Sequence, residues 1–131
     1  ISRYDALKKI SILEKKNKKP HLYGLVADQS PQIRTNNYWS KFLGVKVPVF
    51  TGSERIAKKY DLPVVYGKMK KIKRGYYSLE FKLIVENTNN YKDFEITEKY
   101  LRLVENQLHE DPHPYLWTHN RFKHMDKAPK D

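Results

Sequence analysis

The stretch PVVYGKMKKIKRGYYSLEFKLIV, residues 63–85, decides the fold predicted for this chain. Two runs, 63–72 and 76–85, are rich in β-branched and aromatic residues, and the short sequence Lys73-Arg74-Gly75 between them is typical of a hairpin turn. The second run alternates as a strand does, so its residues divide between two faces. One face carries Tyr77, Leu79, Phe81, Leu83 and Val85, and the other carries Tyr76, Ser78, Glu80 and Lys82. We therefore predict an antiparallel hairpin whose apolar face, tyrosines included, packs into the core.

Apolar residues at helical spacing predict three helices around this hairpin. The first is expected over about residues 2–17, with Tyr4, Leu7, Ile10 and Leu13 as its apolar stripe. A short helix over 54–60 follows Ser53, a residue type that caps helix N-termini. The third is expected over about 96–108, where Ile96, Tyr100, Val104 and Leu108 form the stripe.

Two short apolar runs predict buried strands between these helices. LYGLVA, residues 22–27, ends in Asp28, and a second run occupies residues 47–50. The polar, turn-rich stretch 32–40 between them is expected to be a loop. The resulting order predicts an α/β fold in which a mixed sheet with an antiparallel hairpin is flanked by helices, in a single domain spanning 1–131.

The charge of the chain is strongly positive and unevenly distributed. There are 26 Lys and Arg against 15 Asp and Glu, which gives a formal net charge of +11, and the isoelectric point is about 9.7. Basic residues concentrate in residues 1–27 and 55–74. Such clusters attract nucleic acid, anionic lipid headgroups, phosphorylated glycolipids or an acidic protein, and they also form ordinary solvated surfaces. Charge alone therefore gives the sign of a partner and not its identity.

Several classes of site are excluded by composition. The chain has no Cys, so it has no disulfide, no Cys-based zinc site and no thiol nucleophile. No apolar run approaches the roughly 18 residues that a membrane-spanning helix needs. The five His, at positions 21, 109, 113, 119 and 124, lack the H-E-x-x-H spacing of a zinc protease.

Polar residues at the ends of predicted strands are the candidate site. Asp28 and Gln29 follow the run 22–27, and ligands of open α/β sheets gather at such carboxyl ends, although Asx residues also start ordinary turns. Thr51-Gly52 lies between a strand and a helix, where backbone N–H groups favour a phosphate. The aromatic side chains nearby line an acyl groove or fill the core; they are Tyr38, Trp39, Phe42 and Phe50.

Six segments, in order and spacing, resemble one known family. They are LYGLVADQSP (22–31), NYWSKFLG (37–44), VPVFTGSERIAKKYDLPVV (47–65), KRGYYSLEFKLI (73–84), FEITEKYLRLVENQL (94–108) and YLWTHNRFKH (115–124). In these segments the chain resembles the C-terminal part of the bacterial lipid A biosynthesis acyltransferases, the late lauroyl/myristoyl enzymes of the lysophospholipid-acyltransferase class. The DQSP and LWTHNRFKH segments resemble its Bacteroides-type branch most.

The resemblance implies a function and a set of residues. The family transfers an acyl chain from acyl carrier protein to a lipid A precursor, using a His-x4-Asp/Glu pair as general base and orienting acid. None of the five His here has an acid five residues later, so the resemblance implies a C-terminal fragment of a longer acyltransferase without catalytic residues, metal or cofactor. The substrate-binding residues that it implies are Asp28, Gln29, Phe50, Thr51, Gly52, Arg74, Trp117 and Arg121.

The resemblance also implies partners and a location. We expect acyl carrier protein, a phosphorylated glycolipid and an anionic membrane surface as partners, at the cytoplasmic face of the bacterial inner membrane, with peripheral attachment or an anchor in a preceding segment. The fragment is expected to lack acyl transfer activity and to form a dimer through exposed residues among Tyr38, Trp39, Phe42 and Phe50. No nucleic acid is expected on this hypothesis. The alternatives are a small basic nucleic-acid-binding module and a purely structural interaction domain.

Overall fold

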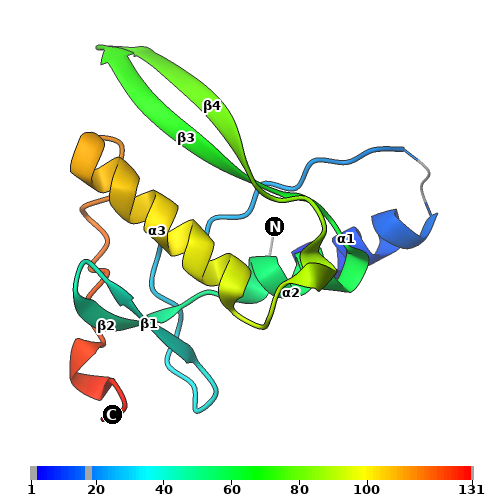
Figure 1. The fold of residues 1–131 in the computed structure, drawn as a ribbon, viewed down its shortest axis with the longest axis horizontal. Coiled ribbons are helices and arrows are strands. Elements are labelled where there is room, and N and C mark those ends of the chain that lie inside the picture. The colour runs from blue at the N-terminus through cyan, green and yellow to red at the C-terminus, as the bar shows by residue number, and fades with distance from the viewer. Residues whose placement is uncertain (1–2, 17–18, 131) are drawn as a thin grey trace.

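In the part of the chain that the structure describes, three helices and two β-hairpins make up the fold (Figure 1). The computed structural model describes residues 3–16 and 19–130, with the side chains of 8–15 and 19–130. The helices are α1 (Arg3–Lys16), α2 (Gly52–Tyr60) and α3 (Glu95–Glu110). The hairpins pair β1 (Tyr38–Phe42) with β2 (Val45–Val49) and β3 (Val64–Lys73) with β4 (Tyr76–Val85). Two 3-10 turns, η1 (Thr88–Asn90) and η2 (Met125–Lys127), complete the described elements. The predicted α/β class and the predicted hairpin at 63–85 are confirmed.

The core lies where α3 meets both hairpins. Leu101, Val104 and Leu108 recur at helical spacing and bury one face of α3. The β1–β2 hairpin and the base of β3 supply the remaining buried members, which are Phe42, Val47, Val49 and Tyr66. Figure 1 shows α3 running between the two hairpins, and both hairpins contact it. The predicted apolar stripe of the third helix is thus confirmed as its core face at Val104 and Leu108.

The first hairpin was missed because its first strand lies partly in a stretch read as a loop. Residues 38–42 form β1, and Tyr38 pairs with Val49 while Phe42 pairs with Val45. The connection uses Leu43 at φ 49° and Gly44 at φ 80°, and positive φ at both turn residues matches the twist of a hairpin. A Leu in this conformation is strained, but the Glu105 carboxylate accepts the Leu43 N–H at 2.6 Å and holds it there.

The predicted strand at 22–27 is wrong. These residues lie in an extended segment, residues 21–28, that belongs to neither sheet in the described part of the chain. Leu22 and Val26 are 78% and 75% exposed. An apolar run becomes a buried strand when another strand pairs with it, and here each hairpin pairs its strands with one another.

The predicted direction of the hairpin's apolar face is also wrong. We call residues 64–85 the β3–β4 arm, which projects away from the helices in Figure 1. Leu79, Phe81 and Leu83 are 53%, 57% and 56% exposed. Burial is confined to the base, at Tyr66 and Val85, because α3 packs against the base and the rest of the arm extends past it.

The N-terminus of α3 is capped by a residue from another helix. Glu54 in α2 is only 4% exposed and accepts the backbone N–H of Phe94 at 2.7 Å and of Thr97 at 2.9 Å. Its carboxylate also accepts the Thr97 hydroxyl at 2.6 Å, and Lys58 Nζ lies 3.5 Å away. These bonds satisfy N–H groups that a helix leaves unpaired and place a negative charge at the positive end of its dipole. The predicted cap Ser53 lies inside α2, whose N-cap position is Thr51.

We expect Glu54→Ala to lower the free energy of unfolding by about 3 kcal/mol, since buried donors to a charged acceptor lose their partner. Glu54→Gln, which keeps one carbonyl acceptor, should cost less. Urea denaturation followed by circular dichroism measures both. Arg55→Ala, an exposed neighbour in α2, is the control and should change stability by less than about 0.5 kcal/mol. Equal stability of Glu54→Ala and wild type would contradict the role of this carboxylate.

Candidate functional site

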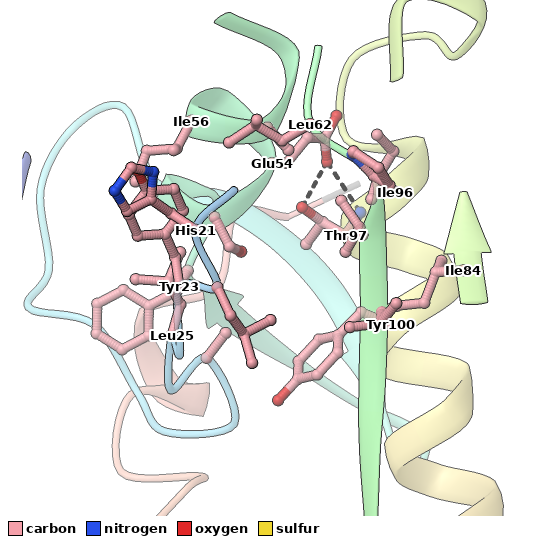
Figure 2. Close-up of a pocket in the computed structure, with 18 residues that line it drawn as sticks. His21, Tyr23, Leu25, Glu54, Ile56, Leu62, Ile84, Ile96, Thr97 and Tyr100 are labelled. Carbon is pink, nitrogen blue, oxygen red and sulfur yellow. Dashed lines mark hydrogen bonds between the residues drawn. The ribbon is translucent and has the colours of Figure 1, made fainter. Parts of the chain in front are cut away.

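An apolar cavity of about 350 Å³ lies between the extended segment, α2, the base of the β3–β4 arm and the first turns of α3 (Figure 2). Its walls come mainly from aliphatic side chains, among them Leu25, Ile56, Leu62, Ile84 and Ile96. Figure 2 shows the Tyr100 ring extending from α3 towards the segment that carries Leu25. Pockets of a few hundred Å³ with apolar walls and few polar groups are typical small-ligand sites.

A second cavity, of about 330 Å³, contains the polar groups of the site. Asp28, Tyr66, Gln107 and Tyr115 line it, and Tyr100 lines both cavities. Tyr66 Oη donates to Gln107 Oε1 at 2.5 Å, and Tyr115 Oη donates to the main-chain oxygen of Asp28 at 3.3 Å. The arrangement places one carboxylate and three phenol groups beside an apolar chamber.

The two cavities lie on opposite sides of the extended segment. Successive side chains of an extended chain point in opposite directions. Leu25 and Ala27 accordingly line the apolar cavity, while Val26 and Asp28 line the polar one. In all, this unpaired segment supplies five residues to the apolar cavity, His21, Leu22, Tyr23, Leu25 and Ala27, and two to the polar one, Val26 and Asp28.

The tyrosine hydroxyls of the polar cavity are held in their protonated form. Burial, followed by the charge of Asp28, raises the pKa of Tyr66 to about 12. The same two causes, in the same order, raise the pKa of Tyr100, and the neighbouring Tyr66 and Tyr115 add to the shift. Burial also raises the pKa of Tyr115, against an opposing effect of Arg121. Each hydroxyl is thus a hydrogen-bond donor throughout the physiological pH range.

Arg121 connects the C-terminal segment to the rest of the site from a buried position. It is 2% exposed, and its Nη1 donates to Pro48 O at 2.8 Å and to Ser30 Oγ at 3.2 Å. Ser30 Oγ donates in turn to Arg121 O at 2.7 Å, and the Ser30 N–H donates to His119 Nε2 at 2.9 Å. The guanidinium lies 5.4 Å from the centroid of the Phe42 ring, and burial lowers its pKa. These bonds fix the chain just after Asp28 against β2.

The residues predicted for substrate binding are only partly brought together. Asp28 lines the polar cavity and Phe50 lines the apolar one. Thr51 and Gly52 lie at the start of α2. Trp117 and Arg121 line a third cavity of about 250 Å³ beside Phe42. Gln29 lies half-buried next to Asp28, and Arg74 is exposed in the turn between β3 and β4 and lines none of the three cavities.

Sequence reasoning missed the tyrosines that surround Asp28. Tyr100 was assigned to the core stripe of α3, and Tyr66 to a strand, because their spacing fits those elements. A tyrosine in an apolar stripe carries a hydroxyl that needs a partner when buried, and this requirement is the signal that could have identified them. In residues 3–16 and 19–130 no group of three or more His, Asp or Glu is placed to hold a metal ion. No helix in the same residues has the length and apolar character to cross a membrane.

Comparison with known families identifies a match over most of the chain. The model of the family described as bacterial lipid A biosynthesis acyltransferase matches residues 1–124. Searches of curated proteins and of solved structures found no match.

We expect the buried tyrosines to make the fold sensitive to alkali. The pKa of Tyr66 rises from 10.0 to about 12 on folding, so its contribution to stability is complete below pH 10 and is lost as the pH rises towards about 12. Urea denaturation at a series of pH values across this range measures the loss, and Tyr66→Phe should reduce it. If the free energy of unfolding fell with rising pH equally in wild type and in Tyr66→Phe, the role given to the Tyr66 hydroxyl would be contradicted.

Proposed function

Since the chain belongs to the bacterial lipid A biosynthesis acyltransferase family, we propose that it forms part of an enzyme that transfers a fatty acyl chain from acyl carrier protein to a lipid A precursor. The observation that carries this proposal is the pair of cavities that share Tyr100. A hydrocarbon chain needs an apolar chamber, and the sugar and ester groups at its end need hydrogen-bond partners.

In this proposal the two chambers divide the substrate between them. The acyl chain occupies the apolar cavity, where Phe50 and Leu25 are among the walls. Asp28 and the hydroxyls of Tyr66 and Tyr100 face polar atoms of the acceptor or of the thioester. Arg121 acts by positioning the segment that carries Asp28, because Arg121 bonds to Ser30. Trp117 acts through Tyr115, since the two rings pack edge to face and the Tyr115 hydroxyl bonds to Asp28 O.

No residue of this chain is proposed to perform the chemical step. The resemblance places that step on a His-x4-Asp/Glu pair, and the sequence contains no such spacing. A positioned general base contributes about 10²–10⁴-fold to the rate. We therefore propose that this chain alone does not transfer acyl groups.

The wider setting is part of the same proposal. We propose a protein of the Bacteroides-type branch, attached to the cytoplasmic face of the inner membrane. The net charge of +11 complements each proposed partner: acidic acyl carrier protein, a phosphorylated glycolipid and an anionic membrane surface. Charge complementarity of this kind accelerates association and weakens with salt.

The aromatic residues expected to form the surface for self-association are not well exposed. Phe42 is buried in the core, and Tyr38, Trp39 and Phe50 are half-buried. We propose instead that two chains associate through the extended segment, whose Leu22 and Val26 are exposed and which is paired with no strand in the described residues. Unpaired extended backbone with apolar side chains tends to acquire a pairing partner.

The acyl-chain proposal predicts a variant that blocks the apolar cavity. Leu25→Trp, at a partly exposed wall position, should weaken binding of a fluorescent fatty-acid probe by at least about tenfold, or 1.4 kcal/mol. Ile12→Trp adds the same ring at a similarly exposed aliphatic position in α1 that lines none of the three cavities, and should change the affinity by less than about threefold. Equal affinities of the two variants would rule out the apolar cavity as the probe's site.

We expect the purified chain to show no acyl transfer and to elute as a two-fold dimer. An assay with acyl-loaded carrier protein and a lipid A precursor measures the first, and light scattering coupled to size-exclusion chromatography measures the second. Turnover that Asp28→Asn abolishes would contradict the claim of inactivity. A monomer of 15.7 kDa would contradict the claim of association.

A further inference from the structure

The β3–β4 arm presents an apolar face that is largely exposed; towards its base, Val65 and Met69 also line the apolar and the polar cavity. The strand register puts Val65 opposite Leu83, Gly67 opposite Phe81 and Met69 opposite Leu79. These pairs alternate with pairs on the other face, so their side chains share one side of the arm. All five of the apolar side chains are more than one-third exposed, whereas Tyr66, on the opposite face, is buried against α3. The outward face of the arm is therefore the apolar one.

Polarity changes along this face towards the tip. Lys71 stands opposite Tyr77 on the same side of the arm, two residues beyond the Met69–Leu79 pair. The tip adds exposed Ile72 and Tyr76, and Lys73 Nζ lies 4.4 Å from the centroid of the Tyr76 ring. Aliphatic residues followed by tyrosines and lysines are the composition of elements that lie at a membrane–water interface.

The charge of the arm has one dominant sign. Residues 64–85 contain six basic residues, Lys68, Lys70, Lys71, Lys73, Arg74 and Lys82, and one acidic residue, Glu80. Lys68 forms an ion pair with Glu110 of α3, and the remaining basic side chains are exposed. Lys68, Lys70 and Lys82 lie on the face opposite the apolar strip, whereas Lys71 lies on its own side and Lys73 and Arg74 follow at the tip. An apolar strip that ends in exposed cations complements an anionic lipid surface, where hydrocarbon and negative headgroups adjoin.

We propose that the β3–β4 arm docks the protein on an anionic lipid bilayer, with the Val65–Leu79–Phe81–Leu83 face in the interface and Tyr76 and Tyr77 at headgroup level. The purpose of this contact rests on the proposed function, since a glycolipid acceptor resides in a bilayer. The contact itself rests on the geometry and charge of the arm. Binding to vesicles is measured without any acyl transfer, so the two proposals fail separately.

A second copy of the chain suits this face less well. Two arms packed face to face would bring together ten net positive charges, five from each, since each arm has six basic residues and one acidic. Like charges held within a Debye length of about 8 Å at physiological salt repel one another. The same charges are attracted to a bilayer containing anionic lipid.

The test compares two single substitutions on the same strand. Phe81→Glu places a carboxylate on the apolar face, and Ser78→Glu places one on the opposite face, with the same change in net charge at an exposed position. Co-sedimentation with vesicles of phosphatidylcholine, with and without phosphatidylglycerol, gives the partition coefficients. We expect salt-sensitive binding that requires phosphatidylglycerol, a loss of about fivefold for Ser78→Glu from the charge alone, and a loss of at least about thirtyfold for Phe81→Glu.

A fluorescent reporter variant tests the proposal independently of the Phe81→Glu and Ser78→Glu substitutions. Tyr77→Trp puts an indole on the interface side of the arm, and brominated lipid should quench it beyond the quenching seen for wild type, whose Trp39 lies in β1 and whose Trp117 lies in the segment after α3. Circular dichroism of each variant checks that the fold is retained. Absence of vesicle binding by wild type, equal binding of Phe81→Glu and Ser78→Glu, or unquenched Tyr77→Trp would overturn the proposal. So would a dimer that Phe81→Glu converts to a monomer, which would assign the face to a second copy.

Discussion

The buried carboxylate of Glu54 is the contact on which the rest of the arrangement depends. It joins α2 to the first turn of α3 through three hydrogen bonds, so it fixes where α3 begins. Both hairpins pack on α3, and both larger cavities use Tyr100 of the same helix as a wall. A buried carboxylate is tolerated because its oxygens are paired with donors that would otherwise be unsatisfied. The position of α3 therefore determines the core, the cavities and the direction of the β3–β4 arm together.

A second buried charge, the guanidinium of Arg121, holds in place the segments that lack regular secondary structure. Arg121 bonds to Pro48 in β2 and to Ser30, and thereby holds the end of the extended segment beside the core. Its Nε and Nη2 have no hydrogen-bond partner among the described residues, although Nη1 is bonded and the Phe42 ring lies against the guanidinium. Polar contacts, and not strand pairing, thus position Asp28 in its cavity.

The sequence predicted elements whose signals are local. The arm is predicted by the alternation of apolar and polar residues and by the glycine of its turn, Gly75, which adopts φ 79° in the structure. Helix α3 is predicted by its apolar repeat. Both patterns depend on backbone period alone. The sequence does not predict the β1–β2 hairpin, because residues 38–40 belong to a polar, turn-rich stretch and because the turn places Leu43 at positive φ, which residue identity does not indicate. For the site, Asp28 and Phe50 were predicted, but the tyrosines around Asp28 come from elements distant in sequence. Which residues converge is a tertiary property that spacing does not encode.

The apolar face of the arm was predicted to pack into the core and is exposed instead, because alternation does not state what covers an apolar face. A period-two pattern states that one face of a strand is apolar, and it is equally satisfied by a protein core and by a lipid interface. Lys71 distinguishes the two, since it lies on the apolar face two residues beyond Met69. In a core its ammonium would need a buried partner to offset desolvation, whereas at an interface its long side chain reaches the headgroups while its methylenes remain among apolar neighbours. Lys71 and the tyrosines beside it therefore favour the lipid interface. With them, the composition of the face changes from aliphatic at its base to cationic at its tip.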